Sequence, residues 1–341
     1  MNSLSPEINS GEIVLLKIAG MFLVMLIGWA AARRRVLRAE TTSLLSRLVV
    51  DLALPALVFT QMLATVEPAR LRTDLWIPFY GFALMPGSLL AAMLVGRLRG
   101  LTTDRRTFRF LIAVPNWIFL PLPIAEAMYG GDGTRFVLLC NIGAQLGMWT
   151  FGVGILSGTR MTRAALRGLA LNSGLLSAIL GIAAACVWPA GRLLVLGAPP
   201  TDASFGLKLI ATFIDAARMV GSVTIPLALL ITGAQLAGLS ANRVRPSLGV
   251  LGVLAGRLVV APLLAMGFVH LGMAVSGVTL PEWARLTAYL IAAMPTGVSC
   301  AMFVERFGGD RELGALGILH TTLASFLTVP GWVWVWHATG W

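Results

Sequence analysis

The polar side chains best suited to chemistry in this chain follow two prolines. Asn116 comes directly after Pro115, and Thr296 comes directly after Pro295, with Ser299 three residues further on. A proline inside a helix removes a backbone donor and frees a carbonyl one turn earlier, so each segment is expected to break its helix. A break presents unpaired amide donors and the positive end of a helix dipole, which suits a carboxylate. The side-chain amide and the two hydroxyls would add hydrogen bonds, and we therefore predict an organic-anion site.

Both features also have plainer explanations, which the sequence leaves open. Prolines commonly kink packed membrane helices without marking a binding site. Asn116 could equally satisfy the backbone groups that Pro115 releases. A matched pair of interrupted segments favours the binding interpretation, because such pairs mark the midplane sites of secondary transporters.

Two ionisable residues lie near the middle of apolar stretches, where a charge is costly and commonly functional. Asp51 precedes Pro55 by one helical turn, so its carboxylate could titrate in a cavity and couple transport to protons. The alternative is a structural ion pair between Asp51 and Arg257. The sequence does not decide between these two interpretations.

A further polar face is predicted in the apolar stretch that follows the first broken segment. Asn141 and Gln145 are spaced i and i+4 and share one helical face with Trp149. We expect this face to line a cavity beside the broken segment, although hydrogen bonding between helices would also explain it. The three cysteines and three histidines show no metal-ligand spacing, so neither a metal nor another cofactor is predicted.

The elements that must position these residues are membrane-spanning helices. Of the 341 residues, 57% are hydrophobic and 12% are charged, and the mean hydropathy is +0.84, whereas soluble domains carry roughly 25% charged residues. A bilayer core about 30 Å thick needs about 20 apolar residues per helix. The chain is therefore predicted to be an all-α integral membrane protein with about ten transmembrane helices. The predicted spans are 12–32, 43–64, 75–97, 107–128, 134–157, 168–189, 212–238, 247–272, 283–305 and 313–337.

The formal net charge of +11 is concentrated in alternate loops. Arginines cluster after the first, third, fifth, seventh and ninth predicted spans, whereas the intervening loops hold few basic residues. By the positive-inside rule, the arginine-rich loops face the cytoplasm and both termini lie outside, in an inner (cytoplasmic) membrane. This distribution of arginines on one side of the lipid bilayer explains the charge, and no nucleic-acid partner is predicted.

This arrangement implies two halves that enter the membrane in opposite senses. Residues 1–157 would hold the first five helices and residues 168–341 the second five, joined by a cytoplasmic linker at 158–167. Prolines interrupt the second and seventh spans and again the fourth and ninth, which are the corresponding members of each half. An inverted repeat in which prolines break helices 4 and 9 is therefore predicted.

Short motifs recur in a fixed order along the chain and together carry a family resemblance. They are Ile27-Gly28, Leu54-Pro55-Ala56-Leu57, Pro115-Asn116, Leu122-Pro123, Leu171-Asn172-Ser173, Ile225-Pro226-Leu227, Gly233-Ala234-Gln235-Leu236, Arg257-Leu258, Ala261-Pro262, Ala293-Met294-Pro295 and Phe303-Val304-Glu305-Arg306-Phe307-Gly308-Gly309-Asp310. With these residues the chain resembles the auxin efflux carrier family, which includes the plant PIN-formed auxin carriers and bacterial malonate carriers.

The resemblance implies a scaffold and a transport domain, with an anionic substrate bound where helices 4 and 9 cross and moved by an elevator-like shift. Pro115 and Asn116 match the family's motif on the fourth helix, and Pro295 matches that on the ninth. Plant members commonly have Gln where this chain has Thr296, and they carry large cytoplasmic loops that are absent here. These departures put auxin itself in doubt and leave the class of carboxylate open. The resemblance also implies a homodimer.

The sequence thus predicts a secondary transporter of a small organic anion, a mono- or dicarboxylate, that works by alternating access. We find no HExxH, GxSxG, Walker or paired-carboxylate motif, which argues against an enzyme. Broken helices also line pores, so an anion channel is one alternative. A membrane sensor that binds a ligand without transporting it is another.

Overall fold

Helices form nearly all of the structure, which is a computed structural model. It describes residues 10–98, 100–101, 104–158, 167–168, 170–189, 191–197, 203–237 and 246–339. Within these residues there is no β-strand, and seven helical stretches are long and apolar enough to cross a membrane. They are Val14–Arg33, Ala39–Thr65, Pro68–Val95, Pro121–Ser157, Phe205–Ala237, Leu248–Ser276 and Arg311–Thr339. The prediction of an all-helical membrane protein is confirmed at this level.

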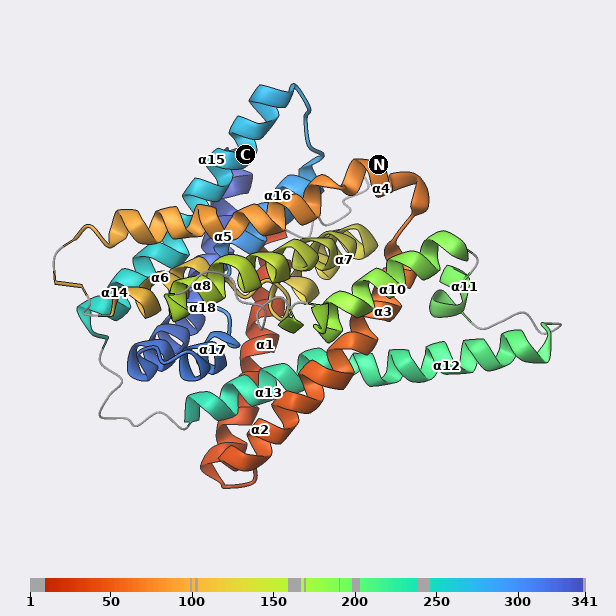
Figure 1. The fold of residues 1–341 in the computed structure, drawn as a ribbon, viewed down its shortest axis with the longest axis horizontal. Coiled ribbons are helices and arrows are strands. Elements are labelled where there is room, and N and C mark those ends of the chain that lie inside the picture. The colour runs from red at the N-terminus through yellow and green to blue at the C-terminus, as the bar shows by residue number, and fades with distance from the viewer. Residues whose placement is uncertain are drawn as a thin grey trace, which may run out of the picture.

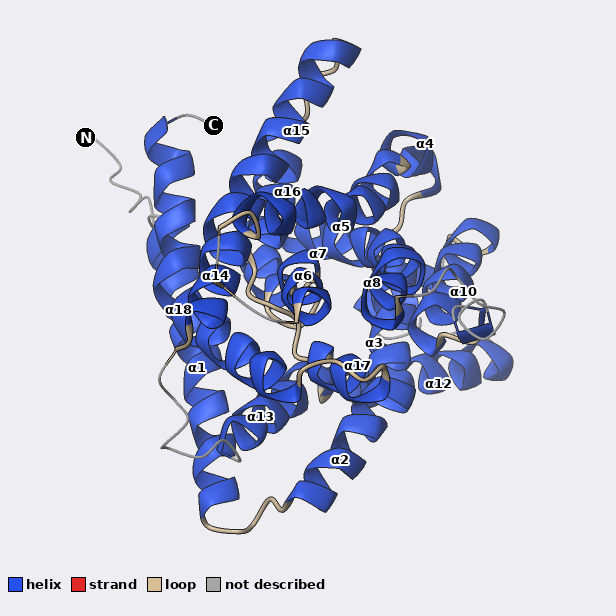
Figure 2. Ribbon diagram, turned by 60° about the vertical axis from the view of Figure 1, so that its left-hand side comes forward, coloured by secondary structure: helices blue, strands red, loops and turns tan. Residues whose placement is uncertain are grey.

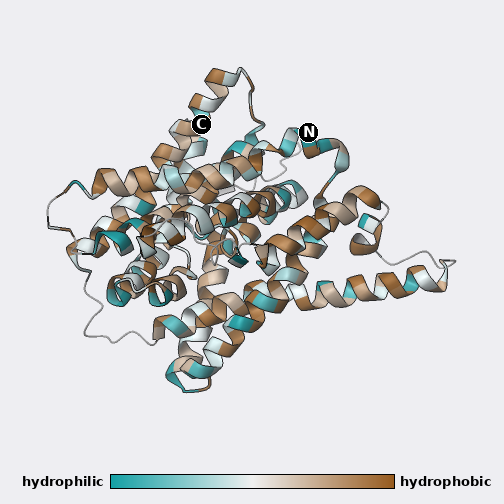
Figure 3. Ribbon diagram, viewed as in Figure 1, coloured by the Kyte–Doolittle hydropathy of each residue, from teal (hydrophilic) through white to brown (hydrophobic). Residues whose placement is uncertain are grey.

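One group of helices packs around α1 and α3, toward the lower right of Figure 1. In this group α1 lies along α13, while α3 packs against both α10 and α12. Many residues of α12 are hydrophobic, as the colours of Figure 3 show, and most of its large apolar side chains are exposed. This is the pattern expected of a helix that faces lipid. The group comprises α1 (Ser10–Arg33), α2 (Ala39–Leu48), η1 (Val49–Ala53), α3 (Leu54–Thr65), α10 (Ser173–Val187), α11 (Gly191–Leu196), α12 (Phe205–Ser222) and α13 (Thr224–Ala237).

The other group packs around α5 and α7, and it contains both interrupted segments. Contacts of α1 with α18 and with α7 join the two groups, and α1 and α18 lie side by side in Figure 2. The second group comprises η2 (Pro68–Arg70), α4 (Leu71–Asp74), α5 (Trp76–Val95), α6 (Arg105–Ala113), α7 (Pro121–Gly147), η3 (Met148–Gly152), α8 (Val153–Ser157), α14 (Leu248–Ala255), η5 (Gly256–Val260), α15 (Ala261–Ser276), α16 (Glu282–Ala293), α17 (Cys300–Arg306) and α18 (Arg311–Thr339).

Glycines allow one helix pair in each group to approach closely. Gly28 and Gly233 lie where α1 crosses α13, and Gly81 and Gly143 lie where α5 crosses α7. A Cβ atom built at any of the four would lie between 1.7 and 2.1 Å from a backbone carbonyl oxygen of the facing helix. Any side chain there would push the helices apart, as is usual for small residues at membrane helix contacts.

Two spanning helices contain a π-helical turn, η1 or η5, shortly before a proline. Each proline lacks an N–H, so carbonyl groups in the preceding turn need another donor. The Ser173 hydroxyl donates to the Val50 carbonyl at 3.2 Å, and the Trp332 indole donates to the Leu258 carbonyl at 2.8 Å. Helices packed alongside therefore satisfy the backbone that these prolines release, as hydrocarbon surroundings require.

The region predicted as spans 107–128 and 134–157 is divided differently in the structure. α6 ends at Ala113, and a helix resumes at Pro121 and continues to Ser157. Gly130, with φ 57° and ψ −135°, interrupts that helix and separates residues 121–129 from the longer part that follows. Ten spans in two inverted halves stays a prediction, and most of the proposed linker at 158–167 lies outside the described residues.

Candidate functional site

The two interrupted segments cross each other in the second helix group. Pro115 and Thr296 form an isolated antiparallel bridge. The Asn116 N–H donates to the Pro295 carbonyl at 2.7 Å, and the Gly297 N–H donates to the Val114 carbonyl at 3.0 Å. The structure therefore brings together the two segments singled out from the sequence, and it joins them through the backbone.

Proline explains why both helices stop at this crossing. A residue that precedes proline is excluded from the helical region by contact with the proline ring. Val114 accordingly has φ −109° and ψ 96°, and Met294 has φ −64° and ψ 150°. α6 and α16 thus end one residue before these positions, and both helices direct their terminal carbonyl groups toward the crossing.

The side chains at the crossing are already partly occupied. The Asn116 Oδ1 accepts the N–H of Phe119 at 3.1 Å, so Asn116 does serve the local backbone, as the plainer interpretation held. Its side-chain amide nitrogen makes no hydrogen bond to the described residues. The Thr296 hydroxyl donates to the Leu111 carbonyl at 2.9 Å, and this residue is fully buried. Ser299 is half-buried just before α17.

Arg257 lies at the crossing, and it is the residue whose position the sequence left most open. It is 0% exposed and extends from the π-helical turn η5. Its guanidinium donates to the Ile112 carbonyl at 2.7 Å, to the Ser88 hydroxyl at 3.2 Å, and to the Ala292 carbonyl. Arg257 therefore contacts the last turns of both α6 and α16.

The alternative ion pair between Asp51 and Arg257 is not formed among the described residues. Asp51 is exposed on η1, in the other helix group, whereas Arg257 is enclosed by α5, α6 and α16. The sequence left this ion pair open as one of two interpretations, and it was considered because Asp51 is an acidic residue near the centre of a predicted span. The partners of Arg257 are two carbonyl groups and the Ser88 hydroxyl, and carbonyl groups carry no signal in a sequence.

The face formed by Asn141, Gln145 and Trp149 lies on α7 and the turn η3 that continues it. Asn141 is 1% exposed, and its Oδ1 has no hydrogen-bond partner. The Trp149 ring lies 5.9 Å from that of Phe303 on α17, edge to face. This end of the face is therefore next to the second interrupted segment, and Asn141 keeps an unused acceptor.

A cluster of charged residues near the start of the longer part of α7, just after Gly130, was missed in the sequence. Arg135 is 3% exposed, and its guanidinium lies 3.0 Å from Asp74 and 2.9 Å from Asp132. Its Nη1 reaches the Thr65 carbonyl at 3.5 Å, and its cation lies 5.8 Å from the ring of Trp283. The i, i+3 spacing of Asp132 and Arg135, near the start of a predicted span, could have indicated this ion pair from the sequence.

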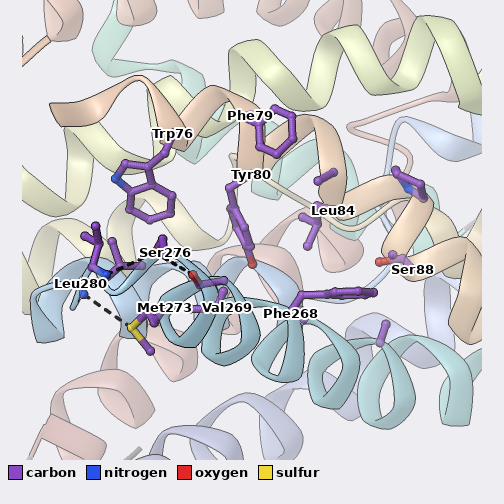
Figure 4. A pocket seen from close by; sticks show the side chains of 17 residues that line it. Trp76, Phe79, Tyr80, Leu84, Ser88, Phe268, Val269, Met273, Ser276 and Leu280 are labelled. Atoms are coloured by element: carbon purple, nitrogen blue, oxygen red, sulfur yellow. Dashed lines mark hydrogen bonds between the residues drawn. The ribbon is translucent and has the colours of Figure 1, made fainter. Parts of the chain in front are cut away.

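A cavity of about 870 Å³ lies between α5 and α15. Figure 4 shows the rings of Trp76, Tyr80 and Phe268 along it, and Ser88 at one end. Its walls are almost entirely apolar, which does not suit a small carboxylate. Ser88 connects this cavity to the crossing, because its hydroxyl accepts from Arg257.

Comparison with known proteins adds a family to this geometry. Residues 13–333 match the model of a family described as membrane transport protein. A protein of Methanocaldococcus jannaschii, named an uncharacterized transporter, is 24% identical over 326 residues, which cover 92% of this chain and 96% of the relative. A protein of Rhizobium meliloti named "Putative malonate transporter" is 24% identical over 318 residues, covering 91% of this chain and 92% of the relative.

Proposed function

Because the chain belongs to the auxin efflux carrier family of membrane transport proteins, we propose that it is a secondary transporter of a small organic anion. The substrate class is a mono- or dicarboxylate, and malonate, for which one relative is named, is the first candidate. The substrate would bind at the crossing of the interrupted segments and be transported by alternating access across the cytoplasmic membrane.

The observation that carries this proposal is the antiparallel bridge between Pro115 and Thr296. Interrupted backbone at membrane depth is tolerated where protein encloses it or where it borders an aqueous cavity. The helix starts after Asn116 and after Ser299 would present partial positive charge to a carboxylate. Their first N–H groups already donate within the preceding turn, as Leu122 does to Ile118 and Cys300 to Gly297, so side chains would have to supply the donors. The unused Asn116 amide nitrogen and the Ser299 hydroxyl would add donors, and Asn141 and Gln145 would line the approach.

The proposal extends to the architecture around the site. The elements would form ten spans in two inverted halves, with both termini outside. The helices packed around α1 and α3 would serve as the scaffold of a homodimer, and the group around α5 and α7 would move against it like an elevator. Asp51, exposed on η1, is the candidate for proton coupling. Uptake by Asp51→Asn that still accelerates with a pH gradient would exclude that role.

Asn116 offers a test in which capping and binding can be separated. In Asn116→Asp the capping oxygen is kept, but the amide donor is replaced by a negative charge that should repel a carboxylate. We expect malonate binding to the purified protein, measured by calorimetry, to weaken by at least about tenfold. Asn172→Asp is the matched control, because Asn172 Oδ1 caps α10 in the same way, accepting from Leu175 N–H at 2.8 Å. Equal affinity in both variants would remove Asn116 from the site.

A carrier and an anion channel are distinguished by counterflow. In proteoliposomes loaded with malonate, external malonate should exchange faster than it enters empty vesicles, because a loaded carrier reorients more readily than an empty one. A channel would show no such acceleration by substrate on the opposite side. Flux through the wild-type protein without this acceleration would favour the channel.

A further inference from the structure

Arg257 joins the ends of the two interrupted helices. Ile112 lies in the last turn of α6, Ala292 lies in the last turn of α16, and one guanidinium donates to both carbonyl groups. The helix that carries Arg257 approaches closely at this point, since a Cβ built at Gly256 would lie 2.5 Å from Ile112 Cδ1. The crossing is thus held by side-chain hydrogen bonds as well as by the backbone bridge.

Arg257 also brings a positive charge that no carboxylate neutralises among the described residues. Arginine stays protonated in proteins. The carbonyl groups at helix ends offer partial negative charge, which solvates the cation but leaves its unit charge in place. Its Nε is buried and has no hydrogen-bond partner. Ala292 precedes the second interrupted segment by two residues, so the charge lies next to the crossing.

We infer that Arg257 is a positioning residue whose uncompensated charge sets the preference of the crossing for anionic ligands. The inference rests on the proposed transport function. A buried cation without a counter-ion is costly in a membrane, and an anion bound at the crossing would relieve that cost. Arg257 would act through the two half-helices and through its field, without touching the ligand, and would distinguish a carboxylate from its neutral amide.

Substitutions at Arg257 separate charge from hydrogen bonding. Arg257→Lys keeps the charge but loses the planar fork, whereas Arg257→Gln keeps N–H donors and loses the charge. We expect Arg257→Lys to bind malonate within about threefold of the wild type, and Arg257→Gln to bind it at least about tenfold more weakly, as a unit charge acting over several ångströms should. Binding of neutral malonamide, measured in parallel, should not change in either variant.

Ser88 allows the same question to be asked with Arg257 in place. It is 2% exposed, and its hydroxyl accepts from the guanidinium at 3.2 Å. Ser88→Asp would place a counter-ion against Arg257, while Ser88→Asn has nearly the same size and no charge. Malonate affinity should fall at least about tenfold in Ser88→Asp relative to Ser88→Asn, while the thermal midpoint of Ser88→Asp is equal or higher.

The outcomes distinguish this inference from the proposed function. Equal malonate affinity in Ser88→Asp and Ser88→Asn, or in Arg257→Gln and Arg257→Lys, would overturn the role of the charge while leaving transport intact. If Arg257→Gln does not fold, the Ser88 pair, which keeps Arg257, decides whether the charge matters. A wild-type protein that binds malonate and malonamide equally would also overturn the inference. Failure of the wild type to bind or transport any carboxylate would instead overturn the proposed function.

Discussion

Arg135 and Arg257 are both almost completely enclosed, with 3% and 0% exposure, yet their surroundings are opposite. Arg135 lies between two carboxylates, at 3.0 Å from Asp74 and 2.9 Å from Asp132. Its Nε and Nη2 atoms are close to these carboxylates but are not oriented for hydrogen bonds, so the attraction between Arg135 and the two carboxylates is mainly Coulombic. Arg257 instead donates hydrogen bonds to carbonyl and hydroxyl oxygens and has no carboxylate partner among the described residues.

The difference indicates what each site is built to do. Neutralising a buried cation with carboxylates ties α7 to α4 and satisfies the charge within the fold. Solvating a cation with carbonyl groups leaves a net charge that a ligand can still compensate. One arginine is therefore neutralised within the fold, and the other keeps a charge that the proposed anionic ligand would compensate.

The largest effect is expected from breaking the Arg135 cluster. Arg135→Gln leaves the Asp74 carboxylate, 11% exposed, without its cation, and removing one partner of a buried ion pair costs about 3–5 kcal/mol. The free energy of unfolding, measured by SDS titration of the detergent-solubilised protein, should fall by that amount. The dissociation constant for malonate should stay within about twofold, because Arg135 is not at the crossing.

A double substitution checks the cause of that loss. Adding Asp74→Asn to Arg135→Gln removes the unpaired carboxylate, so a large part of the lost stability should return. If the double variant is as unstable as the sum of the single variants, the two residues are not energetically coupled. Asp74 would then not act as the structural counter-ion of Arg135.

The elements around these arginines were predictable to different degrees. Hydropathy identified a helical membrane protein, because each spanning helix must satisfy its backbone within an apolar stretch, and seven such stretches are found among the described residues. Proline marked where α6 and α16 end, since a residue before proline leaves the helical region whatever its neighbours are. The family resemblance implied that the two broken helices cross, but the pairing of Pro115 with Thr296 itself has no signal in the residue types, because it is made by backbone groups.

Side-chain partners were less predictable, and Arg257 shows why. Its natural partner by residue type was Asp51, but the two lie in different helix groups. Backbone carbonyl groups are present at every residue, so their role as acceptors is decided by three-dimensional position alone. The Arg135 cluster combines residues from α3, α4 and α7, and only its Asp132 and Arg135 members are neighbours in sequence.

A smaller effect should distinguish support of the Arg257 turn from general packing. Trp332→Phe keeps an aromatic ring but removes the indole donor to the Leu258 carbonyl, next to Arg257. Loss of one such hydrogen bond should lower the free energy of unfolding by about 1–3 kcal/mol, and malonate affinity should fall a few-fold as the turn loosens. Trp334→Phe, on the same helix but 68% exposed, is the control and should change neither quantity. Identical behaviour of the two variants would show that the turn does not depend on Trp332.

The smallest effect is expected at Asp104, which precedes α6. Its negative charge, like the positive charge of Arg257, is stabilised by hydrogen bonds to backbone groups. Asp104 accepts hydrogen bonds from the N–H groups of Arg106, Thr107 and Asp310 and from the Thr107 hydroxyl, at 2.7 to 3.3 Å. Burial opposes its ionisation, but these hydrogen bonds outweigh burial and lower its pKa below the ordinary value of 3.8. The ionised carboxylate therefore adds stability above pH 3.8, and this contribution is lost as the pH falls through the lowered pKa.

The free energy of unfolding, measured as a function of pH, should fall less steeply at acid pH in Asp104→Asn than in the wild type. Asp215→Asn, which removes an exposed carboxylate, should leave this acid dependence unchanged. If the acid dependence in Asp104→Asn equals that of the wild type, the hydrogen bonds to Asp104 contribute no measurable stability. The view that backbone groups stabilise the charge of Arg257 would then lose support.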